Sequence, residues 1–247
     1  FRLYRGDSPP PDAPTLSSVV PNHQGVTATV ARTGTKIASS YKIYTVQDTS
    51  KFCLVTGTAP ASGNTSSTGG SCSITGLTNG TAYTFKVAAI NAAGTGAYSS
   101  ASSSVTPRTV AGVPTGVVGT PGNTEVKLVW VAPSNNGGSE ITDYIIQSCE
   151  GTTCTVFTDS VSALTATTVT GLKNGTAYTF QVAAVNAAKS GSFSEKSDAV
   201  TPRTVPDAPT AVVGTPNDVG QISVTWKAPT NNGGNAISNY VVQRCLN

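Results

Sequence analysis

Apolar and polar residues alternate along short stretches of this chain. Residues 125–131, Glu-Val-Lys-Leu-Val-Trp-Val, place Val126, Leu128 and Trp130 on one face, with the period of two that a half-buried β-strand shows. Gly, Asn, Ser, Thr and Pro are concentrated between such stretches, where they favour turns. The pattern contains no helical period, so it predicts an all-β protein of short strands.

Between residues 109 and 203 the pattern predicts seven strands. They are expected at 113–120, 125–131, 141–149, 154–159, 165–172, 177–186 and 193–201. Seven short strands separated by turns are typical of an antiparallel β-sandwich.

The sequence also repeats itself. Residues 76–91 read GLTNGTAYTFKVAAIN and residues 171–186 read GLKNGTAYTFQVAAVN, and the tyrosines of the two copies are 178 − 83 = 95 residues apart. This period is the size of one small sandwich domain. We therefore expect a strand-like tail with a proline-rich linker at 1–13, then modules at 14–108, 109–203 and 204–247. The third module would be incomplete, since it ends after three strands.

The first module diverges from this pattern. Val30 stands where the second module has Trp130, and a long insertion at 57–71 separates two expected strands. The insertion is polar and rich in glycine, which favours a surface loop.

These repeated features resemble tandem fibronectin type III modules of bacterial extracellular or cell-surface proteins. The resemblance rests on Trp130 and Trp226 in the second strand, Tyr144 and Tyr240 in the third, and the Gly-Leu-x-Asn-Gly-Thr-x-Tyr turn at 76–83 and 171–178. An immunoglobulin domain would need a cysteine on each of two facing strands, and the corresponding strands here have none. The resemblance implies that Trp130 and Trp226 are core residues. Tyr83 and Tyr178 would form tyrosine corners, in which the hydroxyl bonds to upstream backbone.

The chain has five cysteines but one histidine, His23, and no Cys-x-x-Cys sequence, so no zinc site is expected. We predict two disulfides instead. Cys53–Cys72 would fasten the base of the insertion, and Cys149–Cys154 would fasten a hairpin tip. Disulfides place the chain outside the cytosol. The fifth cysteine, Cys245, is equivalent to Cys149 because 245 − 149 = 96, so its expected partner lies beyond residue 247.

Composition excludes several classes of function. The net charge of +3 is too small and too scattered to predict binding to nucleic acid or an anionic membrane, and no run approaches the roughly 18 apolar residues of a membrane span. No catalytic set can be assembled around His23, which lies in a turn, and the carboxylates of Glu140 and Asp143 are expected to be solvated. We therefore predict no enzyme, no cofactor and no metal site.

Two kinds of short motif remain. Arg5-Gly6-Asp7 resembles the integrin-recognition tripeptide, which makes it a candidate adhesion motif, although a polar linker also explains it. Asn64, Asn79 and Asn174 each begin an Asn-x-Ser/Thr sequence and are candidate glycosylation sites. For Asn79 and Asn174, a turn role alone explains the sequence.

Together these observations predict a non-catalytic spacer or adhesion array of a secreted or surface protein. The expected partners are neighbouring modules or subunits and a protein or polysaccharide surface ligand. Three alternatives stay open: an accessory region of a secreted carbohydrate-active enzyme, a subunit of a polymeric surface filament, and an adhesin that acts through Arg5-Gly6-Asp7.

Overall fold

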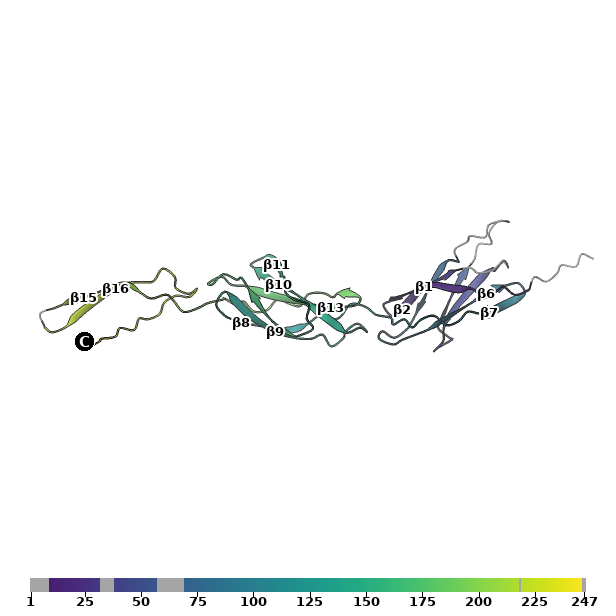
Figure 1. Ribbon diagram of the computed structural model, residues 1–247, viewed down its shortest axis with the longest axis horizontal. Helices are drawn as coiled ribbons and strands as arrows, with labels where there is room; N and C mark the ends of the chain where they lie inside the picture. Colours follow the sequence, from purple (N-terminus) through teal and green to yellow (C-terminus); the bar gives the residue numbers. More distant parts are fainter. Residues whose placement is uncertain (1–8, 32–37, 57–68, 218, 246–247) are drawn as a thin grey trace, which may run out of the picture. The chain divides into compact units, whose positions relative to one another are not determined.

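The computed structural model describes residues 9–31, 38–56, 69–217 and 219–245 (Figure 1). The predictions for Arg5-Gly6-Asp7, for Asn64 and for most of the insertion at 57–71 lie outside these residues. The described residues form sixteen β-strands in antiparallel sheets and no helix. The prediction of an all-β fold with tandem sandwiches is confirmed.

The first sandwich consists of two sheets. Strands β1 (Thr15–Asn22), β2 (Gly25–Ala31) and β5 (Ser71–Thr75) form one sheet in the order β1-β2-β5. The other sheet has the order β4-β3-β6-β7 and consists of β3 (Ser40–Thr45), β4 (Phe52–Thr56), β6 (Phe85–Asn91) and β7 (Gly94–Tyr98).

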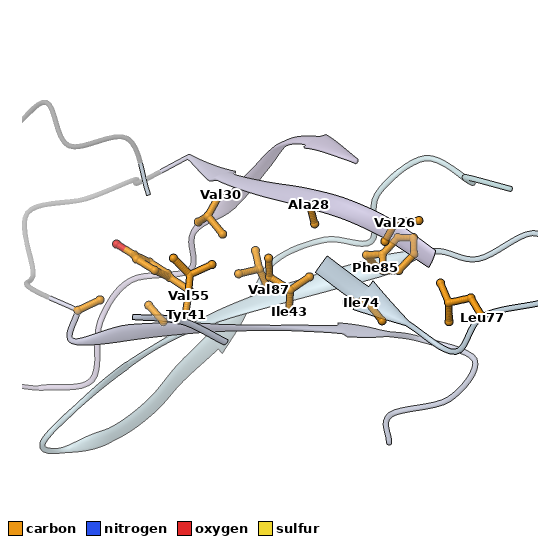
Figure 2. Close-up of a cluster of buried hydrophobic side chains, with 12 residues drawn as sticks. Val26, Ala28, Val30, Tyr41, Ile43, Val55, Ile74, Leu77, Phe85 and Val87 are labelled. Atoms are coloured by element: carbon orange, nitrogen blue, oxygen red, sulfur yellow. The ribbon is translucent and has the colours of Figure 1, made fainter. Parts of the chain in front are cut away.

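The inner faces of these sheets form one apolar core. Val26, Ala28 and Val30 of β2 are buried in the same cluster as Ile43 of β3 and Phe85 of β6 (Figure 2). Each of these side chains is at most 1% exposed. Val30 therefore takes a core position without the bulk of the tryptophan that the second sandwich uses.

The second sandwich repeats this arrangement with β8 (Thr115–Pro121) to β14 (Lys189–Ser190). One sheet has the order β12-β9-β8, and the other has the order β11-β10-β13-β14. The remaining strands are β9 (Glu125–Val131), β10 (Ile141–Glu150), β11 (Thr153–Phe157), β12 (Ala166–Thr170) and β13 (Thr179–Asn186). Along β9 the side chains of Val126, Leu128 and Trp130 are buried while those of Lys127 and Val129 are exposed, as the alternation predicts.

Trp130 packs its ring edge-to-face with Tyr144 of β10, with the two ring centroids 5.1 Å apart. Its Nε1 is buried and has no hydrogen-bond partner among the described residues. Burial raises the pKa of Tyr144. A buried indole N–H usually has a hydrogen-bond partner. Because the N–H of Trp130 has none among the described residues, we attribute the stabilising contribution of Trp130 to packing.

Of the third segment, the structure describes a two-stranded sheet of β15 (Thr210–Pro216) and β16 (Ile222–Lys227). The expected third strand does not form. Its counterpart β10 lies in the other sheet, between β11 and β13, and the described residues from 204 onward supply no equivalent of those neighbours. Trp226 keeps its ring contact with Tyr240 at 5.2 Å but stays partly exposed, because no second sheet formed by the described residues covers it.

The last strand predicted for the second sandwich, 193–201, is not a regular strand. Beyond the two residues of β14, a single bridge joins Val200 to Tyr178. Ser194 and Ser197 bond to β13 instead: the Ser194 amide donates to Val182 O, and the Val182 amide donates back to Ser194 Oγ. Ser197 and Phe180 repeat this exchange. The two serine hydroxyls, three residues apart, accept the hydrogen bonds from β13 amides that the carbonyl oxygens of a neighbouring strand would otherwise accept.

The same device closes the first sandwich. Ser99 exchanges two hydrogen bonds with Val87, Ser102 does so with Phe85, and Val105 bridges Tyr83. Sequence reasoning missed it because a serine every third residue has no strand period. The repeated spacing of 99, 102 and 105 against 194, 197 and 200 was the available signal.

Both predicted disulfides are present. Cys53–Cys72 joins β4 and β5, which are edge strands of the two different sheets. Cys149–Cys154 instead joins directly opposed residues of the neighbouring strands β10 and β11. Cys245 is free and exposed.

The hydroxyls of Tyr83 and Tyr178 accept hydrogen bonds from backbone five residues upstream. The Thr78 amide donates to Tyr83 Oη at 3.1 Å, and the Lys173 amide donates to Tyr178 Oη at 3.2 Å. Both tyrosines thus have the geometry of a tyrosine corner.

By contacts, the chain divides into two compact units. Unit 1 comprises Phe1–Ala111, Asn135–Ile141 and Asn186–Lys189, and unit 2 comprises Gly112–Ser134, Thr142–Val185 and Ser190–Asn247. Two loops of the second sandwich therefore group with the first unit. The module boundaries expected from the repeat stay a prediction.

Replacing Ser197 by alanine should lower the free energy of unfolding of the second sandwich by about 1–3 kcal/mol, because the buried Phe180 amide loses its acceptor. Ser192 is an exposed serine of the same segment, so Ser192→Ala is the matched control and should change stability by less than about 0.5 kcal/mol. Urea unfolding followed by Trp130 fluorescence measures both. Equal effects of the two variants would contradict the role of the hydroxyl.

Reduction should destabilise the two sandwiches unequally. The chain-entropy model relates the loss of unfolding free energy to the number of residues between the two cysteines. Breaking Cys53–Cys72, with a separation of 19, costs about 3 kcal/mol, and breaking Cys149–Cys154, with a separation of 5, costs about 2 kcal/mol. Hydrogen exchange of oxidised and reduced protein, read in peptides from β3 and β10, compares the two losses. A larger loss in β10 would count against this account.

Candidate functional site

Aromatic side chains gather on the outer face of the four-stranded sheet in the first sandwich. We call Lys42, Tyr44, Phe52, Leu54 and Tyr98 the aromatic face. In the register of β3 and β4, Tyr44 lies opposite Phe52 and Lys42 lies opposite Leu54. Because alternate side chains of a strand point to opposite faces, Ile43 enters the core while its two neighbours point outward.

The members of the aromatic face contact one another. The rings of Tyr44 and Tyr98 meet edge-to-face with centroids 5.1 Å apart, and Lys42 Nζ lies 4.2 Å from the centroid of the Phe52 ring. Phe52, Leu54 and Tyr98 are nevertheless 46%, 52% and 49% exposed. Exposed rings held by neighbouring contacts can stack on sugar rings or on apolar side chains of a protein.

The electrostatics of this surface suit non-covalent binding. Burial and the nearby Tyr98 phenol raise the pKa of Tyr44, so its hydroxyl stays neutral at physiological pH. Lys42 supplies a positive charge, and Lys86 lies opposite Tyr44 on β6. The hydroxyl and amide of Ser50 lower the pKa of Asp48 on the adjacent turn.

Sequence analysis did not identify the aromatic face. Its rings come from three different strands, and each alone looks like an ordinary strand residue. In the second sandwich, Gln147 and Val156 are the corresponding cross-strand pair and bring no ring to this position. The sequence could have revealed the aromatic face through a comparison of the two copies, because Tyr44 and Phe52 in the first correspond to Gln147 and Val156 in the second.

A groove of about 640 Å³ lies at the edge of the second sandwich, between β11 and β12. Hydroxyls of Ser148, Thr155 and Thr170 line it together with Phe157 and Glu150. In the first sandwich, Cys53–Cys72 joins the equivalent edge strands. The groove thus offers hydrogen-bonding groups to a ligand.

The side chains of Asn79 and Asn174 tie two turns together. Asn79 Oδ1 accepts from the Gln24 amide at 2.8 Å, and its Nδ2 lies 3.0 Å from His23 Nδ1. Asn174 Oδ1 accepts from the Thr124 amide, and its Nδ2 donates to Asn123 Oδ1, both at 2.8 Å. These bonds explain both asparagines structurally, and glycosylation there stays a prediction.

Asp143, one of the two acidic residues considered for catalysis, has a structural role. Its Oδ1 accepts a hydrogen bond from the Ser162 amide at 3.0 Å. Within the ranges that the structure describes, no three His, Cys, Asp or Glu side chains are placed to hold a metal ion. Those ranges also contain no helix of the length and apolarity that a bilayer crossing requires.

Comparison with known proteins identifies the family of this fold. The model of the fibronectin type III domain matches residues 9–105 and 112–200. Exoglucanase B of Cellulomonas fimi is 30% identical over 188 residues, which are 69% of this chain and 16% of that protein. Chitinase A1 of Niallia circulans is 37% identical over 150 residues, or 57% of this chain and 20% of that protein.

Among solved structures, a multidomain crystal structure from titin covers 77% of this chain and 61% of its own, with 21% identity and a TM-score of 0.48. The chain spans a fifth or less of each of these two enzymes, since the shares are 16% and 20%. The family itself comprises, in general, non-catalytic structural modules. With its two matched sandwiches, this chain belongs to the fibronectin type III domain family.

Proposed function

We propose that this chain is a non-catalytic module array of an extracellular protein, which spaces other domains and contacts a polymer or protein surface. The observation that carries the proposal is the repeated sandwich itself, with a disulfide in each copy. Disulfides persist outside the cytosol, and sandwiches joined by short proline-containing linkers set the distance between the domains that they connect.

The accessory region of a carbohydrate-active enzyme is the setting that the relatives favour. The matches to an exoglucanase and a chitinase cover 16% and 20% of those proteins, so the activities in their names need not reside in the matched part. In this setting the array would hold a catalytic domain at a distance from a binding domain or bring it to an insoluble substrate.

The aromatic face supports a binding role for the first sandwich. Its exposed rings, together with Lys42 and the neighbouring Lys86, suit a polysaccharide chain. The apolar faces of sugars stack on aromatic rings while the sugar hydroxyls bond to the polar groups around them. The filament and adhesin alternatives gain no support from the described residues, and Arg5-Gly6-Asp7 lies outside them.

One experiment tests both parts of this proposal. The purified chain is incubated with insoluble cellulose and with chitin, and the bound fraction and the released sugar are measured. We expect retention without release of sugar. Replacing Phe52 and Tyr98 by alanine should weaken retention by about tenfold or more, because the variant loses two exposed rings on which sugar rings would stack, each worth about 0.5–1.5 kcal/mol.

The double variant Gln147→Ala, Val156→Ala on the second sandwich is the matched control and should bind as the unaltered chain does. Release of sugar would contradict the non-catalytic proposal. Failure of the unaltered chain to bind either polymer would refute a polysaccharide ligand and leave spacing as the function.

A further inference from the structure

We propose that the Asn-Asn-Gly-Gly loop of a module is a docking surface for the end of the preceding module of the same kind. The loop occurs at residues 135–138 and 231–234, and we call each a docking loop. Its partner consists of the Asn-Gly turn and the Thr-Pro-Arg-Thr segment of the preceding repeat. This inference does not depend on whether the array binds a ligand.

The segment that leaves the first sandwich is held by that sandwich up to Arg108. The Gly80 amide, in the Asn-Gly turn, donates to Pro107 O at 2.9 Å. The Arg108 amide donates to Asn22 O, at the end of β1, at 3.1 Å. Pro107 is also buried.

The very next residue is held by the docking loop. The Thr109 amide donates to Gly137 O at 2.8 Å. Asn186 Nδ2 donates to Thr109 O at 2.9 Å and to Asn136 O at 2.7 Å, and its Oδ1 accepts from the Ala188 amide. Asn186 is only 4% exposed, and its buried Nδ2 group joins the segment to the loop by donating to both.

Every residue of the docking loop has a role in this contact. Asn135 and Asn136 accept hydrogen bonds from the amides of Gly137 and Gly138, which preforms the turn. Both glycines have positive φ, at 74° and 81°. A Cβ on Gly137 would collide with the carbonyl oxygen of Thr109, and one on Gly138 would collide with the backbone of Asn79 and Gly80.

The same backbone contacts occur a second time in the chain. The Gly175 amide donates to Pro202 O, the Arg203 amide to Gly122 O and the Thr204 amide to Gly233 O, at 2.9, 2.9 and 2.8 Å. A Cβ on Gly234 would again collide with the Gly175 amide. The first set lies wholly within unit 1 and the second wholly within unit 2. The recurrence shows a surface that the repeat carries with it.

The first module differs from the other two in the docking loop. It has no Asn-Asn-Gly-Gly sequence, although Asn91 donates to Pro9 O at 3.1 Å as Asn186 does to Thr109 O. The docking surface is therefore specific to the second and third repeats, and its partner is a module that ends in Thr-Pro-Arg-Thr. The Thr-Pro-Arg-Thr segment, which by composition is a linker, thus forms one side of the docking surface.

Trypsin tests the proposal on the intact chain, because the bond between Arg108 and Thr109 follows an arginine. We expect slow cleavage there in the unaltered protein. Gly137→Ala should accelerate cleavage by about tenfold or more, because the added Cβ displaces Thr109 and each lost hydrogen bond raises the open population by about fivefold. Mass spectrometry of the products over time gives the rate at this bond.

Gly151→Ala is the matched control. Gly151 also has positive φ, at 59°, but a Cβ added there would meet nothing within 4 Å, so this variant carries the backbone strain without the collision. Asn186→Asp removes the donor to Thr109 O in the segment and the donor to Asn136 O in the docking loop, so it should also accelerate cleavage, whereas Asn91→Asp should not. Cleavage after Lys127, within β9, reports on unfolding of the sandwich.

Rapid cleavage after Arg108 in the unaltered protein would overturn the proposal. So would equal rates for Gly137→Ala and Gly151→Ala. If Gly137→Ala also increases cleavage after Lys127, the comparison of Asn186→Asp with Asn91→Asp decides: a selective increase at Arg108 supports the docking surface, and none refutes it.

Discussion

The burial of one face of each sheet against another sheet is the constraint on which this structure depends. In the first sandwich, β2 and β3 can bury Val26 and Ile43 only because the two sheets lie face to face. The third segment supplies the contrast, since its described residues form one two-stranded sheet and leave Trp226 partly exposed. Burial of apolar area is the main favourable term in folding, so a sandwich forms only when both of its layers are present.

Because the inner faces are committed to the core, the outer faces and the sheet edges are free to differ between copies. The first sandwich places rings on its outer face and joins its two sheets at the edge with Cys53–Cys72. The second places Gln147 and Val156 on the corresponding positions and leaves a groove at that edge. Functional differences between the copies are therefore expected outside the core.

The ends of the modules are as constrained as the cores, for a different reason. The turn that precedes the tyrosine corner presents the Gly80 amide, and the strand that follows ends at Asn186 in the second copy. One repeated stretch of sequence, at 76–91 and 171–186, thus supplies both a turn that holds the outgoing segment and an asparagine that holds an incoming one. The near-identity of the two copies of this stretch follows from these two contacts and from the core residues that it also contains.

How much was predictable from sequence depended on whether a feature has a local period. The alternation along β9 and the disulfide pairs follow from spacing, the tyrosine corners follow from the family resemblance, and the structure has all three. The closing strand was predicted wrongly because Ser194 and Ser197 replace a regular ladder with side-chain acceptors. The aromatic face and the docking contacts depend on register between strands and on distant turns, which no short window of sequence contains.

The central claim, that the modules are joined through a built contact, is tested most directly by hydrogen exchange at the Thr109 amide. Its hydrogen bond to Gly137 O should protect this amide by about 100-fold or more relative to an unstructured chain, a level typical of ordered elements. Exchange at the rate of an unstructured peptide, with the amides of β6 and β10 fully protected, would contradict the claim.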